Sequence, residues 1–291
     1  MLKNYYYLTK PGIIYGNALT TAGGFLLAWR GLPAEALAKA GHINFGLFLA
    51  TLLGISLVVA SACVFNNVID RDIDAKMPRT QNRALVTGLI SKNSAIVYGF
   101  ILGLVGFEIL WVFTSALATF IAFLGWFVYI FLYSPLKPRS VHATLIGSIA
   151  GAAPPVVGYS AVTNNFDAGA IILFLILVFW QMPHFYAIAI RRLNEYQTAG
   201  IPVLPAKKGI FLTKINMLLY ITGFILAAAT LSIFGYTGKI YLTAMLALGA
   251  IWLYLCMQGF RVKNDKLWAR RMFLFSLVVI VLFCILIGIG V

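Results

Sequence analysis

The segment Asn66-Asn67-Val68-Ile69-Asp70-Arg71-Asp72-Ile73-Asp74 follows directly on a long apolar segment, residues 43–65. The chain has 291 residues but only 8 Asp and Glu, and three of these acids lie here, although carboxylates near a membrane are costly. Asn66, Asp70 and Asp74 recur at every fourth position, which on a helix places them on one face about 6 Å apart. Because Mg²⁺ is bound by oxygen ligands together with substrate phosphates, we expect this column to hold Mg²⁺ and to receive a diphosphate. The competing interpretation is a charged helix end without a ligand, and the scarcity of acids elsewhere disfavours it.

The composition is that of an integral membrane protein, since 62% of the residues are hydrophobic and 10% are charged. We expect an all-α fold with nine transmembrane helices and a single transmembrane domain, 1–291. Thr114-Ser115 is expected to separate the third and fourth spans. The expected spans are 12–29, 43–65, 94–113, 116–134, 142–162, 169–190, 211–234, 239–258 and 272–290.

Basic residues indicate the topology. If the N-terminus is cytoplasmic, all but Arg30, Lys39 and Lys239 of the 22 Lys and Arg lie in cytoplasmic segments. This asymmetry predicts a C-terminus on the opposite side, and it explains the net charge of +14 through the lipid bilayer rather than nucleic acid. The compact chain without a long presequence favours a bacterial inner (plasma) membrane, with the active site facing the cytoplasm.

Two polar loops, 66–93 and 191–210, follow the second and sixth spans, and we expect them to form one site. In the first loop, Arg79 and Arg83 could neutralise a diphosphate through forked hydrogen bonds. In the second loop, Glu195 either completes the metal shell or orients a basic residue, and Lys207 is a candidate phosphate partner. The alternative for each basic residue is ordinary positive-inside charge.

Inside the sixth span, His184 lies close to Gln181. An ionisable residue within the membrane is a functional candidate, and His184 could ligate an iron porphyrin or hydrogen-bond a propionate. The alternative is a hydrogen bond between helices. Pro154-Pro155 in the fifth span and Pro183 in the sixth predict kinked or broken helices that either line a cavity or serve packing alone.

The N-x-x-x-D-x-x-x-D motif at the cytoplasmic end of the second of nine helices resembles the UbiA superfamily of intramembrane prenyltransferases. Further segments resemble its heme O synthase branch, and the most specific are Ala-Ala-Pro-Pro at 152–155 and Trp-Gln-Met-Pro-His at 180–184. Thr-Lys-Pro-Gly-Ile at 9–13 and Ile-Pro-Val-Leu-Pro at 201–205 also fit. Asn194-Glu195-Tyr196 departs from the Lys-Asp-Tyr element often found in that branch, and a second D-x-x-x-D motif is absent from the sequence.

The resemblance implies a UbiA-like helical bundle with a central cavity, which converts heme B to heme O. The farnesyl group of farnesyl diphosphate would pass to a heme vinyl group, with addition of water and release of diphosphate. A heme A synthase or a terminal oxidase would receive the product. The implied site residues are Asn66, Asp70 and Asp74 for Mg²⁺ and, with Arg83, for catalysis; Lys10, Arg71, Arg79, Arg83 and Lys207 for the diphosphate; Gln181 and His184 for heme; and Glu195 and Tyr196 from the second loop.

Two other functions remain open from the sequence. One is a UbiA-type prenyltransferase acting on an aromatic acid in quinone synthesis. The other is a cation-coupled membrane transporter, whose charged residues should lie nearer the bilayer midplane than the rim where this acidic cluster falls.

Overall fold

The computed structural model describes residues 1–31 and 44–289, so Lys39 lies outside the described residues. These residues form helices and no strand, which confirms the all-α prediction. The helices in chain order are α1 (Leu2–Leu8), α2 (Pro11–Arg30), α4 (Phe45–Ile69), α5 (Arg71–Asp74), α6 (Lys92–Phe113), α7 (Ala116–Phe127), the π-helix η1 (Val128–Tyr133), α8 (Ser134–Leu136), α9 (Ala143–Gly151), α10 (Ala153–Thr163), α11 (Ala168–Arg191), α12 (Leu193–Thr198), α13 (Leu204–Ile233), α14 (Lys239–Gln258) and α15 (Asp265–Ile289).

Eight helical stretches in the described part of the chain are long and apolar enough to cross a membrane, so the chain is a multi-pass membrane protein. The first expected span corresponds to α2, which has 20 residues but is not among the eight. Its apolar run is interrupted by Asn17, Thr20, Thr21 and several glycines. The count of nine spans therefore stays a prediction.

Several helix ends differ from those expected. Ser115 separates α6 from α7 as predicted, and its hydroxyl accepts a hydrogen bond from the backbone N–H of Ala118, a normal N-terminal cap. The last helix begins at Asp265 rather than at 272, because the polar sequence before 272 continues the helix beyond its apolar part. Likewise α13 begins at Leu204 rather than at 211, with a kink at Gly209, where φ is +82°.

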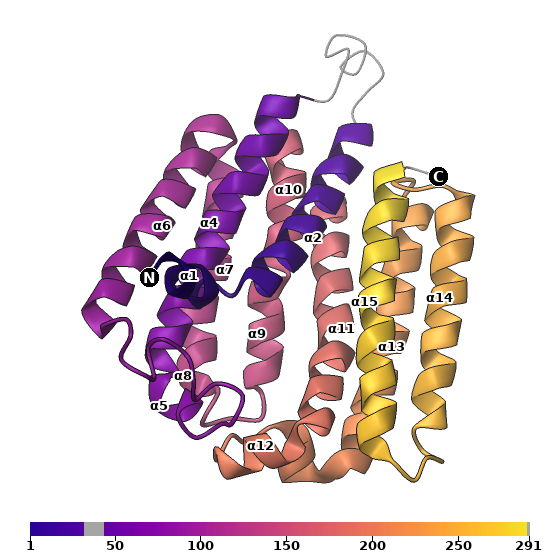
Figure 1. The fold of residues 1–291 in the computed structure, drawn as a ribbon. Coiled ribbons are helices and arrows are strands. Elements are labelled where there is room, and N and C mark those ends of the chain that lie inside the picture. The colour runs from indigo at the N-terminus through magenta and orange to yellow at the C-terminus, as the bar shows by residue number, and fades with distance from the viewer. Residues whose placement is uncertain (32–43, 290–291) are drawn as a thin grey trace.

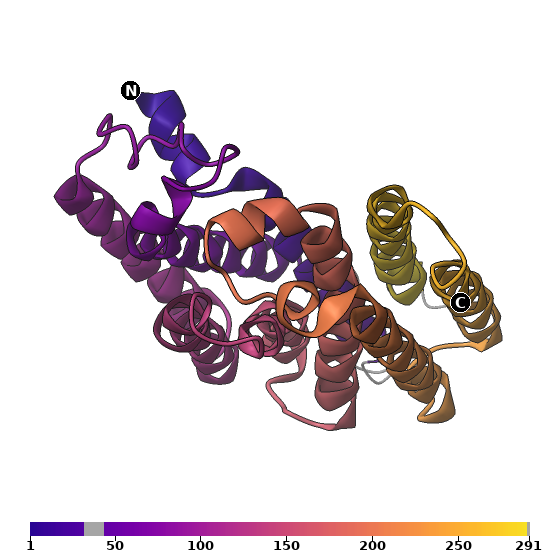
Figure 2. The same cartoon turned by 90° about the horizontal axis from the view of Figure 1, so that it is seen from below.

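The helices stand side by side in one bundle, and the polar segments α5, α8 and α12 gather at one end of it (Figure 1). The last turn of α15 lies at the other end. Viewed from the polar end, α12 lies over the space between the N-terminal helices and α11 (Figure 2). This arrangement agrees with the predicted gathering of the polar loops, while the side of the membrane that this end faces stays a prediction.

The fifth expected span is broken, as its prolines predicted. Its first half, α9, ends at Gly151, and α10 begins at Ala153 with proline in its first turn, where a missing N–H costs nothing. Small residues let α10 approach α2 closely, since a Cβ on Gly158 would lie 2.1 Å from the carbonyl oxygen of Thr21. By contrast, α11 continues through Pro183 without ending there.

Candidate active site

The acidic column lies where α4 passes into α5. Asp70 lies between α4 and α5. Its backbone N–H nevertheless donates to Asn66 O at 2.8 Å, and that of Asp74 donates to Asp70 O at 2.8 Å. The helical hydrogen-bonding pattern therefore continues, and it keeps all three side chains on one face. Asn66, Asp70 and Asp74 are only 2%, 1% and 3% exposed. Two carboxylates are thus buried at the polar end of the bundle, where they need compensating charge.

Three cations surround this column. The ammonium group of Lys137 lies 2.5 Å from Asp70 Oδ2, and a guanidinium nitrogen of Arg83 lies 2.5 Å from Asp74 Oδ2. Lys10 donates a hydrogen bond to Asn66 Oδ1. Opposite charges so close, with one partner almost fully buried, form charge-assisted hydrogen bonds that fix the carboxylates in place.

The amide of Asn66 is oriented by Ser134. The Ser134 hydroxyl donates to Tyr129 O at 2.9 Å, so it accepts the hydrogen bond from Asn66 Nδ2, also at 2.9 Å. The amide oxygen of Asn66 is thereby turned toward Lys10, on the same side as the two carboxylates. Asn67 has a supporting role, because its Nδ2 donates to Leu8 O at 2.7 Å while its Oδ1 accepts from Arg83 at 2.9 Å.

The column has donor atoms that fit Mg²⁺. Asp70 Oδ1 is buried and has no hydrogen-bond partner, so this acceptor is available to a ligand. In the described ranges, no group of three or more His, Cys, Asp and Glu is placed to hold a metal ion. Two carboxylates and one amide oxygen leave coordination positions for waters and phosphate oxygens, which is the usual arrangement around Mg²⁺.

The two lysines of the site differ in their titration. The pKa of Lys10 is lowered to about 8, chiefly by burial and also by the nearby charges of Arg83 and Lys137, against the opposing effects of Cys63 and Asp70. Burial also opposes the charge of Lys137, but Tyr133 and Asp70 outweigh it and raise its pKa to about 12. Lys137 is therefore a permanent cation. Lys10 adopts left-handed backbone angles (φ +54°), which for a non-glycine residue is a local strain typical of functional sites.

The second polar loop reaches the first, as expected. Glu195 accepts hydrogen bonds from Arg192 at 3.1 and 3.2 Å and lies 3.9 Å from Arg79. Glu195 contacts guanidinium groups rather than the acidic column. These contacts match the second of its two expected roles, which is to orient basic residues. Tyr196 lines the same pocket as Asn66 and Asp74.

Two predicted diphosphate residues are not brought to this pocket. Arg71 and Lys207 are exposed and line neither of the two cavities described below. Arg71 is one residue beyond Asp70, which on a helix turns it about 100° away from the column. Lys207 belongs to the part of α13 that precedes the kink at Gly209.

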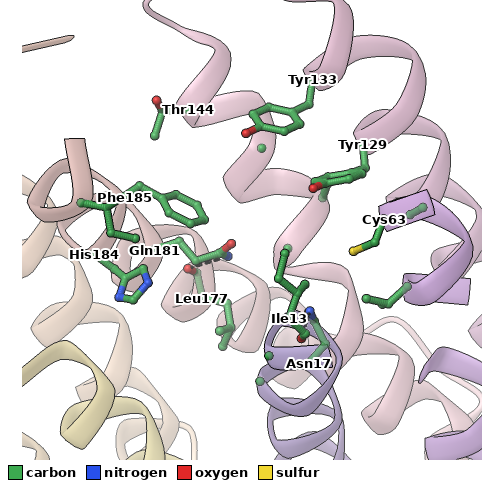
Figure 3. A pocket seen from close by; sticks show the side chains of 18 of the residues that line it. Ile13, Asn17, Cys63, Tyr129, Tyr133, Thr144, Leu177, Gln181, His184 and Phe185 are labelled. Carbon is green, nitrogen blue, oxygen red and sulfur yellow. Dashed lines mark hydrogen bonds between the residues drawn. The ribbon is translucent and has the colours of Figure 1, made fainter. Parts of the chain in front are cut away.

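Two adjoining cavities occupy the polar half of the bundle. The polar one, of about 670 Å³, is lined by Lys10, Asn66, Asp74 and Arg83, among others. The larger one, of about 870 Å³, extends between the helices, and its size is typical of small-molecule sites. The two share a boundary that includes Tyr129 and Tyr133. In Figure 3 these tyrosines lie across the larger cavity from Gln181, His184 and Phe185.

Gln181 and His184 both line the larger cavity. Gln181 Nε2 donates to Ser148 O and to Leu177 O, both at 3.0 Å, which ties α11 to the broken fifth span. The Ser276 hydroxyl donates to Phe273 O at 2.6 Å, so it accepts the hydrogen bond of 2.7 Å from His184 Nδ1. The neutral ring of His184 therefore carries its proton on Nδ1. Its Nε2 is an acceptor without a partner among the described residues.

Sequence reasoning did not single out Tyr129, Tyr133, Ser134 or Lys137, which all belong to the site. Lys137 is one of the many basic residues that the sequence assigns to the predicted cytoplasmic side, and nothing in the local pattern distinguishes it from the others. One feature of the sequence could have indicated Lys137. It follows Tyr133 by four residues at the end of a span, which places both residues on one helical face. Their approach to Asp70 is a tertiary contact between α8 and α4 that local sequence does not encode.

Comparisons with known proteins agree with this geometry. The sequence model of the UbiA prenyltransferase family matches residues 19–278. The protoheme IX farnesyltransferase of Sodalis glossinidius is 52% identical over 96% of this chain and 92% of its own length. That of Protochlamydia amoebophila is 51% identical over 96% of this chain and 95% of its own.

Solved structures share the fold. The structure of a digeranylgeranylglyceryl phosphate synthase superposes with a TM-score of 0.77 at 18% identity, covering 99% of this chain and 98% of that one. A UbiA homologue from Archaeoglobus fulgidus, bound to GPP and Mg²⁺, superposes with a TM-score of 0.72 at 16% identity, covering 98% of this chain and 99% of that one.

The chain belongs to the UbiA prenyltransferase family, whose fold it shares. Within that family it groups with the protoheme IX farnesyltransferases, which it matches at half or more of its positions over nearly its full length.

Proposed function

We propose that this chain, acting as one membrane domain over 1–291, converts heme B to heme O. It transfers the farnesyl group of farnesyl diphosphate to a vinyl group of heme, at the cytoplasmic face of a bacterial inner membrane. The observation that carries the proposal is the position of the acidic column, of which Asn66 and Asp74 line a polar pocket that adjoins a larger cavity between membrane helices. A prenyl diphosphate requires this combination, because its head is anionic and its tail is apolar.

Asn66, Asp70 and Asp74 would hold Mg²⁺, in keeping with the Mg²⁺ and GPP bound by the homologue from Archaeoglobus fulgidus. The ion, when bound, supplies charge stabilisation to the diphosphate oxygens. Arg83, Lys10 and Lys137 neutralise the remaining charge of the diphosphate head and the additional charge that develops as it leaves. Arg79 adds a guanidinium at the rim of the same pocket.

Departure of the diphosphate leaves an allylic farnesyl cation, which must be shielded from water until the acceptor attacks. Tyr129 and Tyr133 are placed for this, since their rings form part of the boundary between the two cavities and ring faces attract cations. A heme vinyl carbon then forms a bond to the farnesyl carbon. The resulting porphyrin-side cation takes up water and loses a proton, which leaves a hydroxyethylfarnesyl group.

His184 and Gln181 lie on the opposite wall of the larger cavity, where the acceptor would bind (Figure 3). The unpartnered Nε2 of His184 is free to coordinate the heme iron, while Ser276 holds the ring in place through Nδ1. Gln181 is committed to two carbonyl groups, so we assign it the role of shaping the cavity.

The test is incubation of the purified protein with heme B, farnesyl diphosphate and Mg²⁺, followed by mass analysis of the porphyrin. We expect a product that has gained one farnesyl group and one hydroxyl group. Unmodified heme, together with a prenylated aromatic acid in a parallel reaction, would instead assign the chain to quinone synthesis. Cation-dependent uptake into vesicles without either product would favour a transporter.

A further inference from the structure

The wall of the larger cavity formed by the end of α11 and the polar loops carries an excess of positive charge. Arg79, Arg191 and Arg192 all line this cavity, and no Asp or Glu is among the described residues that line it. Behind them, Glu195 pairs with Arg192 at 3.1 Å and with Arg79 at 3.9 Å. Three guanidinium groups thus face one carboxylate, so two positive charges on this wall are uncompensated.

Arg191 is the guanidinium of this group that lacks an anionic partner. It lies in the last turn of α11, is half-buried, and joins no ion pair or hydrogen bond within the described residues. Its guanidinium carbon lies 6.0 Å from the ring centroid of Phe273, and the same ring lies 5.0 Å from that of His184. Arg191 follows His184 by two helical turns, so it lies on the same face about 10 Å nearer the polar end.

We propose that Arg191 and Arg192 bind the two propionate carboxylates of the porphyrin acceptor, and thereby select an acceptor that carries two acidic groups on one edge. This inference rests on the proposed heme substrate. Guanidinium groups pair with carboxylates through two parallel hydrogen bonds, and a half-buried pair at a cavity wall is stronger than one in water. Two carboxylates would also offset the excess positive charge of this wall.

This anchoring orients the acceptor. In protoheme the vinyl groups lie on the edge away from the propionates. With the propionates at the end of α11, the vinyl edge points across the cavity toward Tyr129 and Tyr133, which border the diphosphate pocket (Figure 3). The bond-forming vinyl carbon is thus brought to the place where the farnesyl cation forms.

The experiment compares heme B with its dimethyl ester, which has the same macrocycle but no propionate charge. Each is titrated into the purified full chain in detergent, with the Soret absorbance as the readout. We expect the unaltered protein to bind heme B about 10-fold to 100-fold more tightly than the ester, the range for charge-assisted hydrogen bonds. Arg191→Gln should reduce this discrimination, because only Arg192 then remains to pair with a propionate, whereas Arg191→Lys should recover part of it.

Arg271→Gln is the matched control, since Arg271 is an exposed basic residue of α15 that lines neither cavity. It should discriminate as the unaltered protein does. The KM for farnesyl diphosphate should be unchanged in Arg191→Gln, which separates loss of an acceptor anchor from a general folding defect. If Arg191→Gln does not accumulate, the comparison of the two hemes on the unaltered protein still tests the proposal.

Equal affinity of the unaltered protein for heme B and its ester would overturn the inference, as would undiminished discrimination by Arg191→Gln. Both measurements are independent of turnover. Heme that binds with discrimination but is not farnesylated would refute the proposed function and support the anchor. Equally efficient farnesylation of heme and ester would refute the anchor and leave the proposed function standing.

Discussion

Asp70 has two expected roles, as counter-ion of Lys137 and as metal ligand, and substitutions at Asp70 and Lys137 can separate them. Its Oδ2 contacts Lys137 at 2.5 Å, whereas its Oδ1 is buried without a partner and available to Mg²⁺. In Asp70→Asn the side-chain volume is kept, but Lys137, whose side chain is 21% exposed, loses its counter-charge. We expect the free energy of unfolding to fall by about 2–4 kcal/mol, the range for breaking a largely buried, charge-assisted pair.

The effect on the reaction should be larger. Loss of a group that stabilises charge in the transition state lowers kcat on the order of 10²-fold to 10³-fold. Asp72→Asn is the matched control, because Asp72 is an exposed carboxylate two residues away that should tolerate the same change with near-normal activity. Farnesyl transfer to heme, measured by mass analysis over a range of Mg²⁺ concentrations, and thermal unfolding in detergent provide the two readouts.

The double variant Asp70→Asn with Lys137→Gln tests whether Asp70 binds metal or acts only as the counter-ion of Lys137. Since it removes both members of the ion pair, it should be more stable than the sum of the two single effects predicts. Its activity should nevertheless lie well below that of Lys137→Gln alone, because the metal ligand is still missing. If the double variant were as active as Lys137→Gln, Asp70 would act only as the counter-ion of Lys137, and the assignment to metal binding would be wrong.

Three further predictions concern the metal, the acceptor and the packing. Treatment with a chelator should abolish farnesyl transfer, and added Mg²⁺ should restore it; full activity in the chelator would exclude the metal. His184→Ala should weaken heme binding in a Soret titration while leaving the KM for farnesyl diphosphate unchanged, and unaltered heme affinity would reduce His184 to a packing residue. Gly158→Ala should lower the free energy of unfolding by about 1–3 kcal/mol, because its Cβ would meet the backbone of Thr21. Gly16→Ala, where nothing lies within 4 Å, should be neutral in the same thermal-unfolding assay, and equal effects of the two would contradict the proposed helix contact.

The sequence was most informative where the relevant order is local. The common face of Asn66, Asp70 and Asp74 follows from helical periodicity alone, and the break in the fifth span follows from two adjacent prolines. The same periodicity already argues against Arg71, which its position turns away from the column. The prediction for Arg71 gave proximity in sequence more weight than the angle around the helix.

Other parts of the site depend on tertiary contacts. Lys137 reaches Asp70 because α8 packs beside the end of α4, and Ser134 reaches Asn66 for the same reason. Lys207 lies in the part of α13 that precedes the kink at Gly209, and the surrounding sequence does not predict this kink. Charge alone could not separate such residues, because the predicted topology assigns nearly all Lys and Arg of the sequence to the same side of the membrane.

The π-helix η1 makes the length of one short segment critical. It spans Val128–Tyr133, so it carries both tyrosines of the cavity boundary and directly precedes Ser134 and Lys137. Its wider turn sets the rotation of everything that follows, and a residue added or removed in it would turn Ser134 and Lys137 by about 100° relative to α4. Asn66 would lose its hydroxyl partner and Asp70 its ammonium partner in one step. A substitution in this segment changes the packing of one side chain, whereas an insertion or a deletion rotates every residue that follows. We therefore expect the number of residues in this segment to vary less than their identity.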